Sequence, residues 1–237
     1  NDLTISLSDE KALTMENGLA DLLDSSSGIT SWGRYYTKSV TLYNAEGEKE
    51  TVSLVAAADE SQMTEYFTFR TRVGHDPIPF EEDSVILTEK TALNLELSVG
   101  DTFYVEAADG SRVQLTLTGI TENYMFTRLY LSGAQLESLL GGTPEWNTVY
   151  GLTGCTTEAE YNALRTKLLA CNYVSSVSFT EDTTSMFGSL IGSLNYVVVL
   201  IIVCAAALAA VSLTGWSLFQ PCLLYTSPSP RDKRQSR

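Results

Sequence analysis

Apolar and polar residues change their pattern sharply after residue 182. Residues 183–230 include no Asp, Glu, Lys or Arg. Within this interval, residues 196–218 read YVVVLIIVCAAALAAVSLTGWSL. As a helix, these roughly 23 residues rise about 35 Å, which exceeds the ~30 Å hydrocarbon core of a bilayer. The pattern predicts a transmembrane helix whose ends are Tyr196 and Leu218, with the rings of Tyr196 and Trp216 near the two interfaces.

A buried helix of a soluble core is the alternative interpretation of this run. Core helices seldom extend this far without a polar stripe, so the membrane interpretation is preferred. A signal peptide is excluded because the run lies near the carboxyl end of the chain.

Short strands and helices are predicted to alternate before residue 182. Apolar spacing predicts a helix over 11–23, and period-two alternation predicts a hairpin of strands 35–43 and 50–56. Further strands are expected at 84–87, 102–107, 112–120, 127–131 and 148–153, and around Val177 and Phe179. Further helices are expected at 133–140 and after Thr157, where Thr157 and Glu160 form the T-x-x-E pattern of a capping box. This mixture indicates an α+β fold.

The net charge of −14 is unevenly distributed along the 237 residues. Four basic residues and one acidic residue in the last seven positions contribute +3, which leaves −17 for the preceding chain. With 44% hydrophobic and 10% aromatic residues, this acidic body can build a core, so disorder is not expected. Its charge repels phosphate backbones, so we expect no nucleic-acid partner.

Few residues could carry catalysis. His75 is the single histidine, which excludes a multi-histidine metal site, and we expect it to lie solvated in a loop. The acidic runs 59–60 and 81–83 lack the ligand spacing of a calcium loop, and the chain has no phosphate-binding G-x-x-x-x-G-K-[ST] motif. We therefore expect no catalytic, cofactor-binding or metal-binding residue, and no enzymatic activity.

Cys155 and Cys171 lie on either side of the helix predicted after Thr157. About 15 helical residues separate their ends by roughly 20 Å, whereas a disulfide needs Cα atoms within about 7 Å. We therefore expect no disulfide between them.

Both ends of the chain suggest a fragment. The residues CLLYTSPSPRD, which begin at Cys222, resemble a translated sequencing-library adapter, so residues 222–237 are expected to be a foreign tail. Basic residues beside a span normally mark its cytoplasmic side, but here they fall in that tail and give no topology. The chain also begins at Asn1 without an initiating Met, and we expect an upstream part to be missing.

Residues 84–120 contain a recognisable block: SVILTEKTALNL at 84–95, LSVGDT at 97–102, and a strand that ends in Gly119 and Ile120. The block resembles the "v-v-i-s-e-k-l-A…l-x-v-G-D-t…v-x-v-x-G-i" pattern in the extracytoplasmic domain of FtsX-like and MacB-like ABC transporter permeases. Val99, Gly100 and Asp101 form its structural motif, a tight turn from a short helix into a strand, where glycine relieves the backbone constraint.

The resemblance covers roughly residues 66–218 and implies a domain organisation. It implies a mixed α/β porter-like ectodomain with a β-rich inserted subdomain, followed by one transmembrane helix. Residues 1–70 and 145–185 are expected to form the two parts of the porter-like subdomain, residues 71–144 the insertion, and residues 196–218 the span.

The resemblance also implies a function. It implies a segment of a permease in the bacterial plasma membrane, with its ectodomain outside the cytoplasm, that couples cytoplasmic ATP hydrolysis to export or release of a lipid, lipoprotein or peptide. The implied partners are a cytoplasmic ABC ATPase that binds the ATP, and other permease helices or a second permease copy. The alternatives are a single-span surface receptor or adhesin and, third, a membrane-tethered hydrolase.

Overall fold

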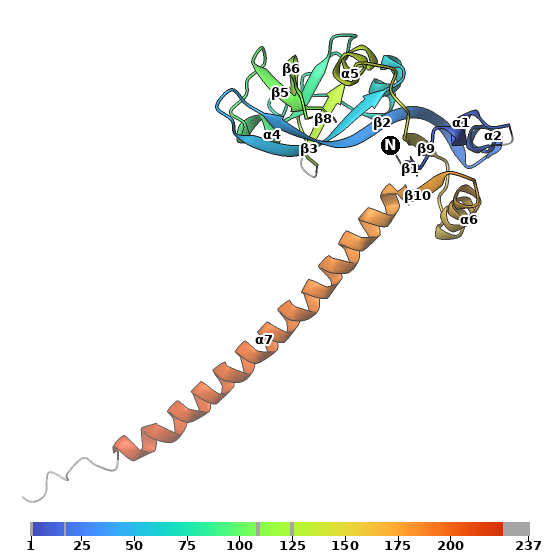
Figure 1. The fold of residues 1–237 in the computed structure, drawn as a ribbon. Coiled ribbons are helices and arrows are strands. Elements are labelled where there is room, and N and C mark those ends of the chain that lie inside the picture. The colour runs from blue at the N-terminus through green and yellow to red at the C-terminus, as the bar shows by residue number, and fades with distance from the viewer. Residues whose placement is uncertain (1, 17, 108–109, 124–125, 225–237) are drawn as a thin grey trace, which may run out of the picture. The chain divides into compact units, whose positions relative to one another are not determined.

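The computed structural model describes residues 2–16, 18–107, 110–123 and 126–224, and the chain divides into two units, Asn1–Glu181 and Asp182–Arg237. The first unit is built on a mixed sheet (Figure 1). Its strands are β1 (Leu3–Leu7), β2 (Ile29–Tyr43), β3 (Lys49–Ala57), β4 (Val85–Thr88), β5 (Thr102–Glu106), β6 (Arg112–Thr116), β7 (Gly119–Thr121), β8 (Arg128–Leu131), β9 (Thr148–Thr153) and β10 (Val174–Phe179).

The strands follow the order β10-β1-β9-β2-β3-β8-β4-β7, while β5 pairs with β2 and β6. β3 pairs with β8, and β4 with β7, in parallel, whereas the other neighbouring pairs are antiparallel. Helices accompany the strands in the same unit: α1 (Lys11–Thr14), α2 (Leu19–Ser25), α3 (Glu60–Tyr66), α4 (Glu89–Asn94), α5 (Gly133–Leu140) and α6 (Glu158–Leu169). The predicted α+β class is confirmed, and the division into a porter-like part and an insertion stays a prediction.

The predicted hairpin is confirmed as β2 and β3, which pair from Tyr35 opposite Ala57 to Tyr43 opposite Lys49. Its turn is organised by the buried Asn44, whose Oδ1 accepts the backbone N–H groups of Glu46 and Glu48 at 3.0 and 2.9 Å. A short polar side chain that bonds backbone two residues ahead is a typical turn former.

Two helix predictions are confirmed by their caps. At α5, Ser132 Oγ accepts the Gln135 N–H at 3.2 Å. At α6, Thr157 accepts the Glu160 N–H while the Glu160 carboxylate accepts the Thr157 N–H, which is a complete capping box.

Two element predictions are wrong. The single helix predicted over 11–23 is two helices, because the chain turns extended at Met15 and Gly18 approaches it closely. A Cβ on Gly18 would lie 2.7 Å from the Met15 carbonyl oxygen. The strand predicted over 112–120 divides into β6 and β7, because Thr118 donates its N–H to the Val85 carbonyl and β7 then pairs with β4 instead of β5.

Three apolar clusters fill the first unit. One lies around β3, β4, β5 and β8 and includes Leu54, Leu87, Phe103 and Leu129; a second lies around β1, β9, β10, α2 and α6; the third is rich in aromatic rings, including Tyr35, Phe67 and Tyr150. Leu115 and Leu117 are buried in the first cluster with Val113 packed against it, as the alternation of that strand indicates.

The second unit consists, within the described residues, of most of helix α7 (Thr180–Leu224). The window Leu194–Ser212 is long and apolar enough to cross a membrane, and none of it is buried. The predicted span ends, Tyr196 and Leu218, both lie within α7. Of the predicted foreign tail, residues 222–224 are the last of α7, and residues 225–237 lie outside the described part of the chain.

Candidate functional site

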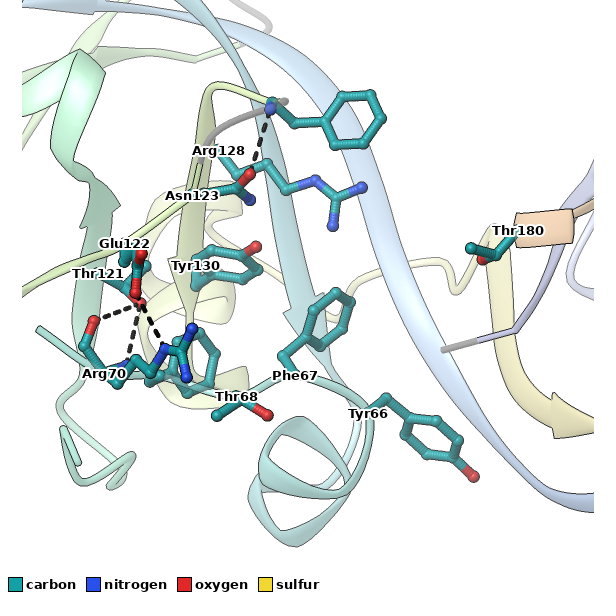
Figure 2. Close-up of a pocket in the computed structure, with 12 residues that line it drawn as sticks. Tyr66, Phe67, Thr68, Arg70, Thr121, Glu122, Asn123, Arg128, Tyr130 and Thr180 are labelled. Atoms are coloured by element: carbon teal, nitrogen blue, oxygen red, sulfur yellow. Dashed lines mark hydrogen bonds and ion pairs between the residues drawn. The ribbon is translucent and has the colours of Figure 1, made fainter. Parts of the chain in front are cut away.

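A cavity of about 570 Å³ opens to solvent in the first unit (Figure 2). Three parts of the chain that are distant in sequence line it: residues 66–70 from the end of α3 onward, residues of 121–123 and 126–130 from β7 and β8, and Thr180 at the start of α7. Hydrogen bonds join the first two parts: the Arg70 N–H donates to Thr121 Oγ1 at 3.2 Å, and the Glu122 N–H donates to the Arg70 carbonyl at 2.9 Å. Strand β4 lies between β7 and β8 and pairs with both.

Aromatic rings form the floor of the cavity. Helix α3 ends at Tyr66, and the extended chain that follows turns Phe67 and Phe69 inward while Thr68 stays exposed. The ring of Tyr130 in β8 lies 5.4 Å from Phe67 and 5.0 Å from Phe69 between centroids. Phe67 also meets Tyr150 edge to face at 5.3 Å. These pairings lie in the distance range of stabilising aromatic contacts, so the floor is well packed.

The floor carries no charge near neutral pH. Burial raises the pKa of the Tyr130 hydroxyl above its ordinary value, and the nearby Arg128 opposes this shift. Burial likewise raises the pKa of Tyr66. Both phenols therefore stay protonated near neutral pH.

One side of the cavity is closed by an ion pair. Arg70 Nε lies 3.0 Å from Glu122 Oε2, and the Glu122 backbone N–H donates to the Arg70 carbonyl at 2.9 Å. His75 Nδ1 lies 3.5 Å from the same carboxylate oxygen. The Glu122 side chain is only 6% exposed, so its charge is balanced locally by Arg70. The loop position expected for His75 is confirmed, and its side chain is 60% exposed.

Arg128 lies on the opposite side and has a different environment. Its guanidinium lies 4.9 Å from the centroid of the Phe126 ring and 5.7 Å from that of Phe67. It forms no ion pair with any carboxylate that the structure describes. Its backbone N–H donates to Thr88 Oγ1 at 3.1 Å, which fixes the start of β8. The arrangement is a cation stacked on aromatic surface beside an open cavity.

The motif read from the sequence lies elsewhere in the first unit. Ser98 and Asp101 close a four-residue turn, in which the Ser98 N–H donates to Asp101 Oδ2 at 2.8 Å and the Asp101 N–H to the Ser98 carbonyl at 3.0 Å. Gly100 has a φ of +98°, and Val99 is 59% exposed. The turn joins α4 to β5, and its three residues do not line the cavity.

The described residues contain no group of three or more His, Cys, Asp or Glu side chains placed to hold a metal ion. Cys155, Cys171 and Cys204 are free thiols, and burial raises the pKa of Cys155 and Cys171. A raised pKa keeps a thiol protonated and unreactive, which gives neither cysteine the character of a nucleophile.

The sequence alone predicted no site at the residues of this cavity, including Glu122, Arg128 and Tyr130. A local signal exists for these residues. Each stretch combines aromatic residues with an arginine, as Phe-Thr-Phe-Arg at 67–70 and Phe-Thr-Arg-Leu-Tyr at 126–130. What brings the two stretches together is the sheet topology, which local patterns do not specify.

No protein-family model matches the chain, and no curated protein matches its sequence. Solved structures of similar fold include the periplasmic region of MacB from Actinobacillus actinomycetemcomitans, at 11% identity and a TM-score of 0.47, over 79% of this chain and 92% of that one. They also include the extracellular domain of the noncanonic ABC-type transporter YknZ from Gram-positive bacteria, at 12% identity and a TM-score of 0.45, over 76% of this chain and 98% of that one. The similarity to both is one of fold.

Proposed function

We propose that this chain is the extracytoplasmic domain and one membrane helix of an ABC transporter permease. In this proposal the permease couples ATP hydrolysis in the cytoplasm to export or release of a lipid, lipoprotein or peptide. The observation that carries the proposal is the direct passage from sheet to membrane helix. Strand β10 ends at Phe179, α7 begins at Thr180, and α7 contains the apolar window Leu194–Ser212. No loop lies between β10 and α7 in the chain.

The residues that carry the sequence resemblance support the proposal through the fold. Residues 84–120 form β4, α4, β5, β6 and β7 in succession. Their apolar positions, including Val85, Leu87, Leu95, Phe103 and Leu117, are buried in one cluster. The pattern therefore specifies how this part of the domain packs, and a chain that shares it is expected to share the domain.

The proposal gives the chain a mechanical role and no chemistry of its own. It places neither an enzymatic activity nor a bound cofactor in this chain, and it places ATP on a separate ATPase subunit or domain. The proposal also places further permease helices or a second permease copy beside α7 in the bilayer.

The complete gene with its neighbours gives the first test. We expect the reading frame to continue into further apolar spans, and an ATP-binding protein with a phosphate-binding loop to be fused to it or encoded beside it. A stop codon shortly after the first span, with no such ATPase, would identify a single-span receptor or adhesin instead.

The second test is topological. Intact cells or spheroplasts that express the complete permease are treated with an added protease, and fragments of residues 1–181 are detected with an antibody. The proposal requires cleavage in cells whose cytoplasmic marker protein stays intact. Protection of residues 1–181 until the membrane is lysed would place the domain in the cytoplasm and contradict the proposal.

A further inference from the structure

Arg128 is the arginine of the cavity lining that no carboxylate of the described residues pairs with. Residues 1–182 contain six arginines and carry a net charge of −17. Arg70 and Arg72 each pair with a carboxylate, those of Glu122 and Glu89. Arg128 has no such partner among the described residues, although acidic side chains greatly outnumber basic ones. Its guanidinium instead lies over two aromatic rings at the side of the cavity (Figure 2).

We propose that this cavity binds a peptide segment that carries one carboxylate next to a bulky apolar side chain. The guanidinium of Arg128 pairs with the carboxylate, and the rings of Phe67 and Phe126 pack against the apolar side chain. A guanidinium is planar and can donate two parallel hydrogen bonds to a carboxylate. Stacking on rings holds that plane in one orientation, so little further ordering is needed when the anion binds.

The other polar groups of the lining suit a peptide. Thr68, Asn123 and Thr180 bring hydroxyl and amide groups to a cavity whose floor is aromatic. Sites for small ligands commonly combine such an apolar floor with a few polar groups that fix orientation. Phe126 is 52% exposed, so its ring offers apolar surface that the fold leaves uncovered.

Charge favours a single carboxylate over a phosphate monoester, which carries nearly two negative charges at neutral pH. Arg70 is already engaged by the nearly buried Glu122, so Arg128 is the cation that remains for a ligand in the described lining. The field of a body that carries −17 disfavours a ligand with two or more negative charges. The cavity is also open to solvent, whereas the acyl chains of a phospholipid bury best in an enclosed slot.

This inference goes beyond the proposed function and is independent of it. A permease could use the site to engage cargo or an extracytoplasmic protein, and a receptor could use it to bind its ligand. The binding experiment and the gene and topology experiments can therefore fail separately.

The test uses the full chain in lipid nanodiscs and isothermal titration calorimetry. The probes are N-acetyl-Gly-Gly-Phe with a free carboxylate and the same peptide as its carboxyl-terminal amide. The two share shape and apolar surface and differ in the anion. We expect the acid to bind about tenfold more tightly or better, since a guanidinium forms stronger hydrogen bonds to a carboxylate than to a neutral amide. Equal affinities for acid and amide, or no binding of either at millimolar concentration, would overturn the proposal.

Variants locate the interaction. Arg128→Gln is expected to abolish the preference for the acid. Arg165→Gln is the matched control, because it removes the same charge at a position outside the cavity. The Arg165 guanidinium lies 5.2 Å from the centroid of the Phe179 ring. If Arg128→Gln does not fold, Phe126→Ala replaces it, since this exposed ring can be removed at little cost to the core. Phe126→Ala should weaken the binding of both peptides. Unchanged binding in the folded variants contradicts the proposal.

A lipid arm distinguishes the source of the anion. Dihexanoyl phosphatidic acid, added below its micelle concentration, carries a phosphate on a short apolar body. We expect that displacing half of the bound acid peptide takes a concentration of this lipid at least about tenfold higher than the concentration of free acid peptide that does the same. Displacement at equal or lower concentration would assign the cavity to lipid and overturn the peptide proposal.

Discussion

At the scale of single residues, Gly100 tests whether the turn of the sequence motif depends on its backbone. Its φ of +98° is a conformation that side chains other than glycine rarely adopt, and a Cβ there would meet open space. Gly100→Ala should therefore lower the free energy of unfolding by about 1–2 kcal/mol through backbone strain alone. Gly142→Ala is the control, because Gly142 has neither a positive φ nor a close neighbour. Urea unfolding measures both, and equal stability of the two variants would contradict this account.

Asn44 makes the second residue-scale prediction. Its side chain is buried, accepts two backbone N–H groups in the β2–β3 turn and donates Nδ2–H to the Leu95 carbonyl at 3.2 Å. Asn44→Ala removes the acceptor of the two turn N–H groups and the donor to the buried Leu95 carbonyl, so we expect a loss of about 1–3 kcal/mol. Asn172→Ala, at an exposed position, should change stability by less than about 0.5 kcal/mol. Thermal and urea unfolding provide the measurement; a tolerated Asn44→Ala would mean that the turn forms without this side chain.

Residues that act through neighbours in sequence were predictable, and those that act through distant neighbours were not. The capping residues Thr157 and Glu160 are three positions apart, so their pattern alone predicts the contact. Arg128 and Phe67 are 61 positions apart, and only the placement of β8 beside β3 and β4 brings them together. For this reason the sequence alone did not predict the candidate cavity.

At the scale of elements, the amino end of α6 links stability to pH. Hydrogen bonds from the backbone of Thr156 and Thr157 hold the pKa of Glu160 below its ordinary value. A carboxyl group with a depressed folded-state pKa stabilises the fold above its unfolded pKa, and this stabilisation disappears as pH falls through the folded pKa. We therefore expect Glu160→Gln to be less stable than the native chain near neutral pH, and the difference to vanish in acid below the ordinary glutamate range. Unfolding curves at a series of pH values measure this, with the exposed Glu158→Gln as control.

Thr157→Ala removes the other half of the same capping box. The Glu160 N–H loses its acceptor at 3.3 Å, so stability should fall by about 1 kcal/mol. Unlike the effect of Glu160→Gln, this loss involves a neutral hydroxyl and should therefore persist at low pH. A pH-independent Glu160→Gln effect, equal in size to that of Thr157→Ala, would show that the carboxylate charge adds nothing to the cap.

Elements with a strong local pattern were predicted well, and those defined by pairing were not. The bounds of α5 and β9 agree with the prediction, since a helix cap marks one and turns enclose the other. Strand β1 and helix α3 were not predicted, and the strand at 112–120 was not divided. Its division at Leu117 and Thr118 depends on hydrogen bonds to β4, some 30 positions earlier, which no local periodicity records.

At the scale of the whole molecule, the assignment to a membrane depends on α7. The window Leu194–Ser212 has no charged side chain, and placing Asp near the centre of a span costs about 2.5–3.5 kcal/mol per residue. The double variant Ile201→Asp and Ala205→Asp should therefore move a large fraction of the chain from carbonate-washed membranes into the soluble fraction. The double variant Ser176→Asp and Ser178→Asp adds the same charge at exposed positions of β10 and should stay with the membranes. If the native chain is itself soluble after this wash, α7 does not span a bilayer. Residues 1–181 would then have no membrane attachment through α7, which contradicts the proposed role in transport.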